Sequence, residues 1–144
     1  GGSVDLAVGL ERLAATARRR GLVVVVSDFL GATDWERPLG RLATRHDVLA
    51  VEVLDPRELE LPDVGVITLT DPETGAQRDV PTGRASVRAR YAEAAANQRA
   101  SIAAGVTRAG AGHLRLRTDR DWLMDLARFI LNRRKRQSAA RRPA

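Results

Sequence analysis

The sequence predicts an α/β protein with a mostly parallel β-sheet, helices on both faces of the sheet and an inserted β-hairpin. Segments of helical periodicity alternate with apolar runs of strand length, an order typical of sheets built from right-handed crossovers. The run LVVVVS at residues 22–27 contains no alternating polar side chains, which predicts a strand in the middle of the sheet, buried on both faces. Two strand-like segments around a turn-rich stretch at residues 71–75 predict the hairpin.

The first half of the chain predicts the order helix, strand, helix, strand. Residues 5–20 carry leucines at helical spacing and end in three arginines, which suit the negative end of a helix dipole. Thr33 and Glu36 have the spacing of a capping box, so a second helix is expected from there to about residue 45. The apolar run at residues 47–54 is expected to form the second strand.

The second half predicts the hairpin, a long helix, a strand and a last helix. The hairpin strands are expected at residues 64–70 and 77–80, and the long helix at residues 84–108. Residues 113–118 alternate strictly between polar and apolar side chains, which favours an edge strand with one face in water.

The last helix is expected to begin in another capping box, with Asp121 three residues after Thr118. Its inward side chains are expected to be Trp122, Leu126, Phe129 and Ile130. Both tryptophans, Trp35 and Trp122, follow an aspartate near a helix start and are expected to pack in the core or at its rim.

The opening helix has no preceding strand from which a crossover would lead into it. We expect that the sequence is the carboxy-terminal part of a larger domain; the alternative is that this helix packs without such a strand. Residues 1–3 are expected to be a cloning scar, residues 4–132 a partial domain, and residues 133–144 a basic, flexible tail. A missing neighbour would leave an apolar sheet edge beside residues 23–26, through which two copies would form a homodimer.

The positive charge is concentrated at the end of the chain. The formal net charge is +6, and without the six basic residues among the last twelve positions, 18 basic residues face 18 acidic ones. This neutral body argues against a nucleic-acid groove, and the arginine-rich tail is the alternative signal, for nucleic acid or an anionic surface. The sequence has no cysteine and no apolar run of the ~20 residues that span a membrane, so a cytoplasmic location is expected.

Oxygen-bearing side chains follow three predicted strands, at Ser27-Asp28, Asp55 and Thr118-Asp119. Because the carboxyl ends of parallel strands share one edge of a sheet, these side chains are expected to lie close together, and such oxygen ligands suit Mg2+. Asp55 precedes a proline and Asp119 lies near a helix start, so structural roles are expected for both. Asp28 directly follows four valines and is the candidate metal ligand.

Four segments carry a resemblance to a known family: SDFLGATDW, RHDVLAVEVLDPRELELPDVGVITLTDPETG, VRARYAEAAANQRASI and DWLMDLARFI. In this order they are similar to the bacterial domain-of-unknown-function family fifty-eight, and the resemblance covers residues 10–134 of the sequence. VVVVSDF with the Trp-bearing helix after it resembles the fourth strand of a von Willebrand factor type A domain. The resemblance implies a von Willebrand type A-like, Rossmann-like fold, and a role as an adaptor or chaperone-system partner of a MoxR-type AAA+ ATPase or its client.

The resemblance also implies part of a cation site. Type A domains hold their cation with an Asp-x-Ser-x-Ser element, a threonine and an aspartate after the fourth strand, and Asp28 matches this aspartate. The sequence contains no Asp-x-Ser-x-Ser element, so a single carboxylate of the site remains. We therefore expect Mg2+ in the full-length protein and no tight binding by this chain.

The sequence contains no complete catalytic constellation. His46 and His113 lie beside predicted strand starts, away from the carboxyl edge, with no motif around them. Phosphate-binding glycine loops and nucleophile elbows are missing, so a hydrolase that used Asp28 would lack a base and a nucleophile. We therefore expect a non-enzymatic protein–protein interaction module.

Overall fold

The computed structural model describes residues 5–70 and 74–140. In chain order the elements, with η for a 3-10 helix, are α1 (Leu6–Thr16), β1 (Leu22–Ser27), η1 (Thr33–Trp35), α2 (Glu36–Ala43), β2 (Asp47–Leu54), η2 (Pro56–Glu58), β3 (Val66–Thr70), β4 (Gln77–Pro81), α3 (Ala85–Arg108), β5 (Gly112–Arg117) and α4 (Trp122–Ala140). This order confirms the predicted α/β class and the predicted hairpin. The proposed cloning scar lies outside the described residues.

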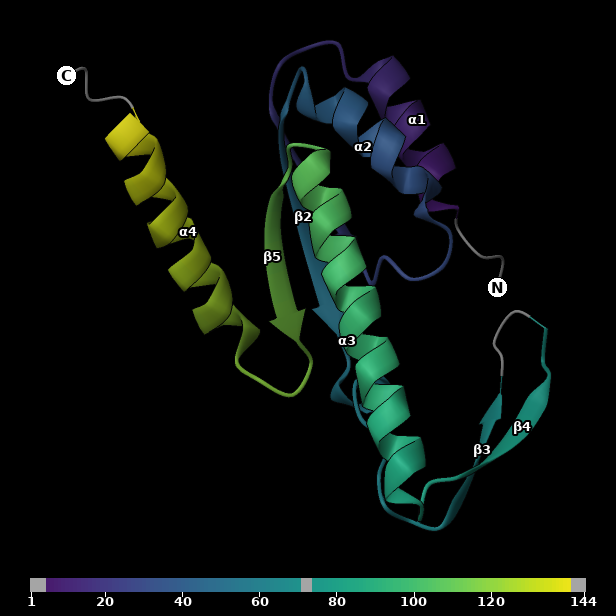
Figure 1. Cartoon of the computed structure of the whole chain (residues 1–144). Coiled ribbons are helices and arrows are strands. Elements are labelled where there is room, and N and C mark those ends of the chain that lie inside the picture. Colours follow the sequence, from purple (N-terminus) through teal and green to yellow (C-terminus); the bar gives the residue numbers. More distant parts are fainter. Residues whose placement is uncertain (1–4, 71–73, 141–144) are drawn as a thin grey trace.

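The main sheet is parallel and has the strand order β1-β2-β5, of which Figure 1 labels β2 and β5. β2 is therefore the central one of these described strands, and β1 lies at the border, where the sequence predicts an open edge; the prediction that residues 22–27 are buried on both faces is wrong. Val23 and Val25 point toward the helices, whereas Leu22, Val24 and Val26 on the opposite face are exposed. The valine run does form a strand, but helices cover only one of its faces.

In the described part of the chain, α1, α2 and α3 cover the first face of the sheet (Figure 1). Alternate residues of β1 and β2 supply its apolar floor, and buried side chains of α1, α2 and α3 pack on it; the cluster consists of Leu10, Val25, Phe29, Trp35, Leu39, Leu42, Val48, Ala50, Ile102 and Val106. Trp35 is 2% exposed, and its ring meets that of Phe29 edge to face, with centroids 5.1 Å apart. The prediction that Trp35 packs in the core is confirmed.

Among the described helices, only α4 lies on the second face (Figure 1). Leu126 and Phe129 pack against a small cluster of Leu49, Val51 and Leu114, as predicted. Trp122 and Ile130 were predicted to face inward, and both are largely exposed. The reason is that α4 packs on β5 at the border of the sheet, so only a narrow stripe of the helix meets it.

The helix starts differ from the predicted capping boxes. Thr33 begins η1 instead of capping α2, and the Glu36 carboxylate forms an ion pair with Arg108 of α3 (2.9 Å). At α4 the capping side chain is Asp121, whose Oδ1 accepts a hydrogen bond from the backbone N–H of Leu123 (3.1 Å). Each segment is helical as expected, but at α2 a tertiary ion pair replaces the predicted capping box, and at α4 Asp121 takes the capping position that was predicted for Thr118.

The outer helices also differ in length from the prediction. α1 ends at Thr16, whose hydroxyl donates to the carbonyl of Arg12 (2.9 Å), so the arginines at positions 18–20 lie beyond the helix. α4 continues to Ala140 and includes the first part of the segment predicted as a tail. In the described ranges, no helix is both long and apolar enough to cross a membrane.

Candidate functional site

The turn after β1 places Asp28 at the carboxyl edge of the sheet, as predicted. Its carboxylate is exposed and accepts a hydrogen bond from the N–H of Leu30 (3.0 Å), while the hydroxyl oxygen of Ser27 accepts one from the N–H of Phe29 (3.1 Å). Phe29 has a left-handed backbone (φ 56°), which buries its ring beneath this turn. Ser27 and Asp28 therefore both shape the turn.

The acids after the other two strands have local structural partners. Asp55 accepts a hydrogen bond from the N–H of Arg57 (2.9 Å) and caps η2. Asp119 forms a two-pronged pair with Arg117 (2.9 Å), whose hydrogen bonds hold the pKa of the aspartate below its usual value. Within the described ranges, no group of three or more histidine or acidic side chains is arranged to hold a metal ion. Asp28 as a Mg2+ ligand stays a prediction.

A buried ionic cluster, which the sequence did not predict, lies between the sheet and α3. Its centre is Glu52 of β2, which is 0% exposed. Glu52 accepts hydrogen bonds from Nη1 of Arg99 (3.2 Å) and Nε of Arg115 (2.9 Å), and its other contact is with Nε2 of His113 (2.7 Å). Arg99 also reaches Glu58 of η2 (2.8 Å). We call these five residues the Glu52 cluster.

The strand register explains how the Glu52 cluster assembles. Glu52 pairs with Arg115 across β2 and β5, and His113 lies two residues earlier on the same face of β5. Arg99 approaches from α3, above this face. The polar face of β5, which the alternation predicted to lie in water, therefore contacts the buried carboxylate. The one signal in the sequence was an acid within an apolar strand, since a buried charge requires partners.

Arg99 connects the Glu52 cluster to the edge of the sheet. Its Nη1 donates to the backbone carbonyl of Asp28 (3.1 Å), and its Nη2 pairs with Glu58. The turn after β1 and the short helix after β2 are thus both fixed to α3 through one guanidinium. Through Arg99, the Glu52 cluster fixes the positions of the turn after β1 and of η2 at this edge.

We expect the Glu52 cluster to make the fold sensitive to acid. Burial by itself raises the pKa of Glu52, but the hydrogen bonds from His113 and Arg115 and the charge of Arg115 outweigh it, so the pKa lies below the ordinary value of 4.5. A lowered pKa means that the ionised glutamate stabilises the fold above the ordinary value, and that this contribution is lost as the pH falls through the lowered one. Urea titrations across acidic pH should therefore show a falling free energy of unfolding. The matched variant Glu52→Gln should show a flatter dependence; an unchanged slope would contradict this assignment.

A second feature is an apolar groove on the face of the sheet that α4 leaves open. Its volume is about 540 Å3. β1, β2 and β5 form the floor and α4 forms one wall; the lining residues are Leu22, Val24, Val26, Asp47, Leu49, Val51, Leu114, Leu116, Leu126, Phe129, Ile130 and Arg133. The polar residues Asp47 and Arg133 form an ion pair. We call this surface the β1–α4 groove.

The side of the β1–α4 groove away from α4 is the outer edge of the sheet. β1 pairs with β2 alone among the described strands, so its other edge has no strand partner there. Val24 is 50% exposed at this border, with Leu22 and Val26 more so. An apolar strand with an open edge and an open face is a surface that other chains can cover. The apolar edge that the sequence predicted is therefore present.

Comparison with known proteins places the chain among proteins of undetermined function. The profile of the family described as "Protein of unknown function DUF58" matches residues 1–101. Uncharacterized protein MAV169 of Mycobacterium avium is 50% identical over 137 residues, which cover 95% of this chain and 80% of that protein. Uncharacterized proteins Rv1480 of Mycobacterium tuberculosis and Mb1516 of Mycobacterium bovis are each 51% identical over 131 residues, or 91% of this chain but 41% of each relative. No solved structure matches the chain.

Proposed function

The chain belongs to the DUF58 family of proteins of unknown function, and we propose that it is a protein-interaction module rather than an enzyme. The observation that carries this proposal is the β1–α4 groove, which joins an apolar sheet face to an open strand edge. Binding of a partner that removes apolar side chains of such a face from water lowers the free energy of the system.

The dimensions of a sheet favour a helix as the occupant of the β1–α4 groove. Neighbouring strands lie about 4.8 Å apart, and packed helices lie about 8–10 Å apart, so one helix covers roughly two strands. α4 packs against β5 and reaches β2 with Leu126 and Phe129, which leaves β1 uncovered on this face. We propose that an amphipathic helix of a partner lies beside α4, with its apolar side on Val24 and Val26.

The partner that we propose is a MoxR-type AAA+ ATPase, as the resemblance of the sequence implies. In the same proposal the parallel sheet corresponds to part of a von Willebrand type A-like domain. Asp28 would supply one cation ligand in the full-length protein, and a carboxylate of the partner would complete the coordination. The exposed position of Asp28 at the carboxyl edge supports this role.

Binding to the MoxR-type ATPase of the same genome should depend on the floor of the groove. We expect Val24→Asp to weaken this binding by about tenfold or more, because a charge at the centre of an apolar interface is left without solvation. Biolayer interferometry with immobilised ATPase would measure the change. Val8→Asp is the matched control, since Val8 is an exposed valine on α1, on the opposite side of the sheet.

Three results would contradict parts of this proposal. Equal affinity for wild type and Val24→Asp would exclude the groove as the ATPase site. A dimer in light scattering that Val24→Asp dissociates, together with absence of ATPase binding, would make the groove a homodimer interface. An affinity for the ATPase that changes neither with Asp28→Ala nor with a chelator would exclude a cation from the contact.

A further inference from the structure

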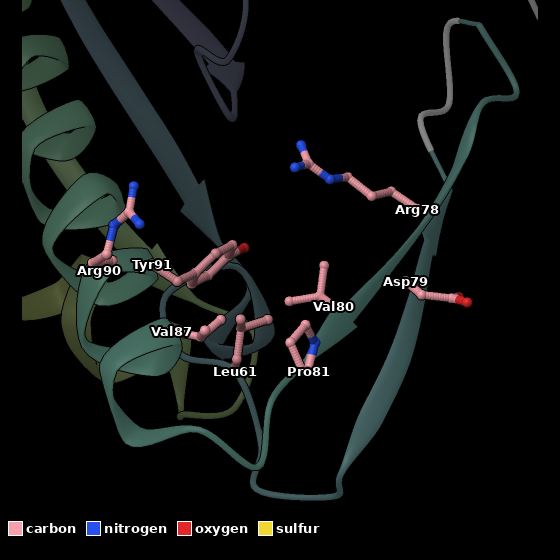
Figure 2. Close-up of a pocket in the computed structure, with 8 residues that line it drawn as sticks. All are labelled: Leu61, Arg78, Asp79, Val80, Pro81, Val87, Arg90 and Tyr91. Atoms are coloured by element: carbon pink, nitrogen blue, oxygen red, sulfur yellow. The ribbon is translucent and has the colours of Figure 1, made fainter.

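A second hollow lies between the β3–β4 hairpin and the start of α3, away from the β1–α4 groove (Figure 2). Its volume is about 470 Å3. Leu61, Val80 and Val87 form an apolar floor, and Tyr91 extends from α3 toward the hairpin. Arg78 extends inward from β4, and Arg90 stands on α3. We call this surface the hairpin hollow.

The base of the hairpin is fixed to α3, which holds the hairpin hollow open. Arg88 donates to the carbonyl of Thr82 (2.6 Å) and forms an ion pair with Asp63 (3.1 Å). The hydroxyl of the buried Thr82 donates in turn to the carbonyl of Gly65 (3.2 Å). The two walls of the hollow therefore keep a defined spacing at their base.

The charge at the hairpin hollow is positive, and no described acid compensates it. Neither Arg78 nor Arg90 has an ion pair or side-chain hydrogen bond with any described residue. Asp79 lies next to Arg78, but its carboxylate points to the other side of the hairpin, where it accepts the hydroxyl hydrogen of Thr68 (2.7 Å). Two guanidinium groups thus flank an apolar floor, and no carboxylate of a described residue lies between them.

The hairpin has two strands, and the contacts of a partner would stabilise it. β3 and β4 pair only with each other in the described part of the chain, and Figure 1 shows them branching from the start of α3 outside the main sheet. A two-stranded hairpin is marginally stable alone, and its open strand edges can accept an extended segment. An occupant of the hollow would add both side-chain and main-chain contacts.

We propose that the hairpin hollow binds an extended acidic segment of a partner protein, in which carboxylates flank an apolar side chain. The apolar side chain enters between Leu61, Val80 and Val87, and the carboxylates pair with Arg78 and Arg90. Arginine suits this role because its planar fork binds a carboxylate through two hydrogen bonds. Tyr91 adds an aromatic wall with a hydroxyl that can donate to the same segment. This site is independent of the β1–α4 groove.

The test is a selection with a random-peptide phage library against the wild-type chain. We expect the enriched peptides to combine aspartate or glutamate with leucine, isoleucine or phenylalanine. Synthetic copies, measured by fluorescence anisotropy, should bind Arg78→Glu/Arg90→Glu about tenfold or more weakly, because each reversal replaces an attraction by a repulsion. Arg12→Glu/Arg37→Glu is the matched control, with the same charge change on exposed residues of α1 and α2. Arg78→Gln/Arg90→Gln gives the same test if the reversed variant does not fold.

Each outcome decides the proposal. Acidic-apolar peptides that lose affinity only in the Arg78 and Arg90 variants would support it. Enriched peptides without acids, or peptides that bind the variants equally well, would overturn it. A single-stranded oligonucleotide that binds the wild type as tightly as the peptides, and loses affinity in the same variants, would show a general anion site and would also overturn it. Binding at this hollow and at the β1–α4 groove is measured with different variants, so either can fail alone.

Discussion

Glu52→Ala should lower the free energy of unfolding by about 3–5 kcal/mol, the range for breaking a buried ion pair by removal of one partner. The carboxylate is fully buried and has two cationic neighbours, Arg99 and Arg115, of which Arg99 is also nearly buried; its third contact is with the ring of His113. Without it, Arg99 and Arg115 would be held close together with no charge between them, and the site would keep a small cavity. Urea unfolding followed by circular dichroism measures the change.

Glu58→Ala is the matched control for this prediction. Glu58 contacts the same Arg99, but its side chain is 41% exposed, so we expect a loss of no more than about 1 kcal/mol. The double variant Glu52→Leu/Arg99→Met should be less destabilised than Glu52→Ala, because it removes the nearly buried Arg99 charge together with the carboxylate and leaves only the half-exposed Arg115 without its partner. Equal losses for Glu52→Ala and Glu58→Ala would contradict the central position of Glu52 in the cluster.

Trp35→Ala should have an effect of similar size, about 3–5 kcal/mol, as large-to-small changes of buried aromatic residues do. Trp35 lies where η1 meets α3, with its ring against Phe29 and close to Gly105. Gly105 allows this approach, since a Cβ there would lie 3.0 Å from the tryptophan ring and 2.6 Å from the Glu36 carboxylate. The loss would therefore loosen the packing of two helices together.

Trp122→Ala provides the comparison, because Trp122 is 55% exposed at the start of α4. We expect a change within about 0.5 kcal/mol for this surface position. Thermal and urea unfolding of both variants give the two values. A small loss for Trp35→Ala, or a large one for Trp122→Ala, would show that the core is built differently from the packing described above.

The element order could be predicted from the sequence because each element has a local signal. The valines of β1, the turn residues around positions 71–75 and the periodicity of α3 all depend on near neighbours in the chain. Local signals could not predict whether the second face of β1 is buried or exposed. Four successive valines are compatible with a strand covered on both faces or on one, and the position of α4 decides between them.

The Glu52 cluster also could not be predicted from local sequence patterns. Glu52, Arg99 and His113 are far apart in the sequence, and the register of β2 with β5 brings them together. Local patterns carry no information on such a register. The capping box predicted at α2 failed for a related reason, since Glu36 pairs with Arg108, which lies 72 positions away. A tertiary ion pair thus replaced a local hydrogen bond that the sequence alone favoured.

The Glu52 cluster and the β1–α4 groove lie on opposite faces of the same sheet. Val24 and Val26 of β1 point into the groove, while Val25 belongs to the core beneath α1, α2 and α3. A rigid core on one face would keep the apolar floor of the other face in place for a partner. This division of the sheet explains how a stable fold can keep an exposed apolar surface.

The most direct test of the proposed function is hydrogen exchange of the chain, measured by mass spectrometry with and without the MoxR-type ATPase. If the groove receives a helix of the ATPase, exchange should slow in β1 at Leu22–Ser27 and in α4 around residues 122–133. Exchange at the hairpin and in α1 should not change. Slower exchange in the hairpin and in α1, with no change in β1, would contradict the β1–α4 groove as the binding surface.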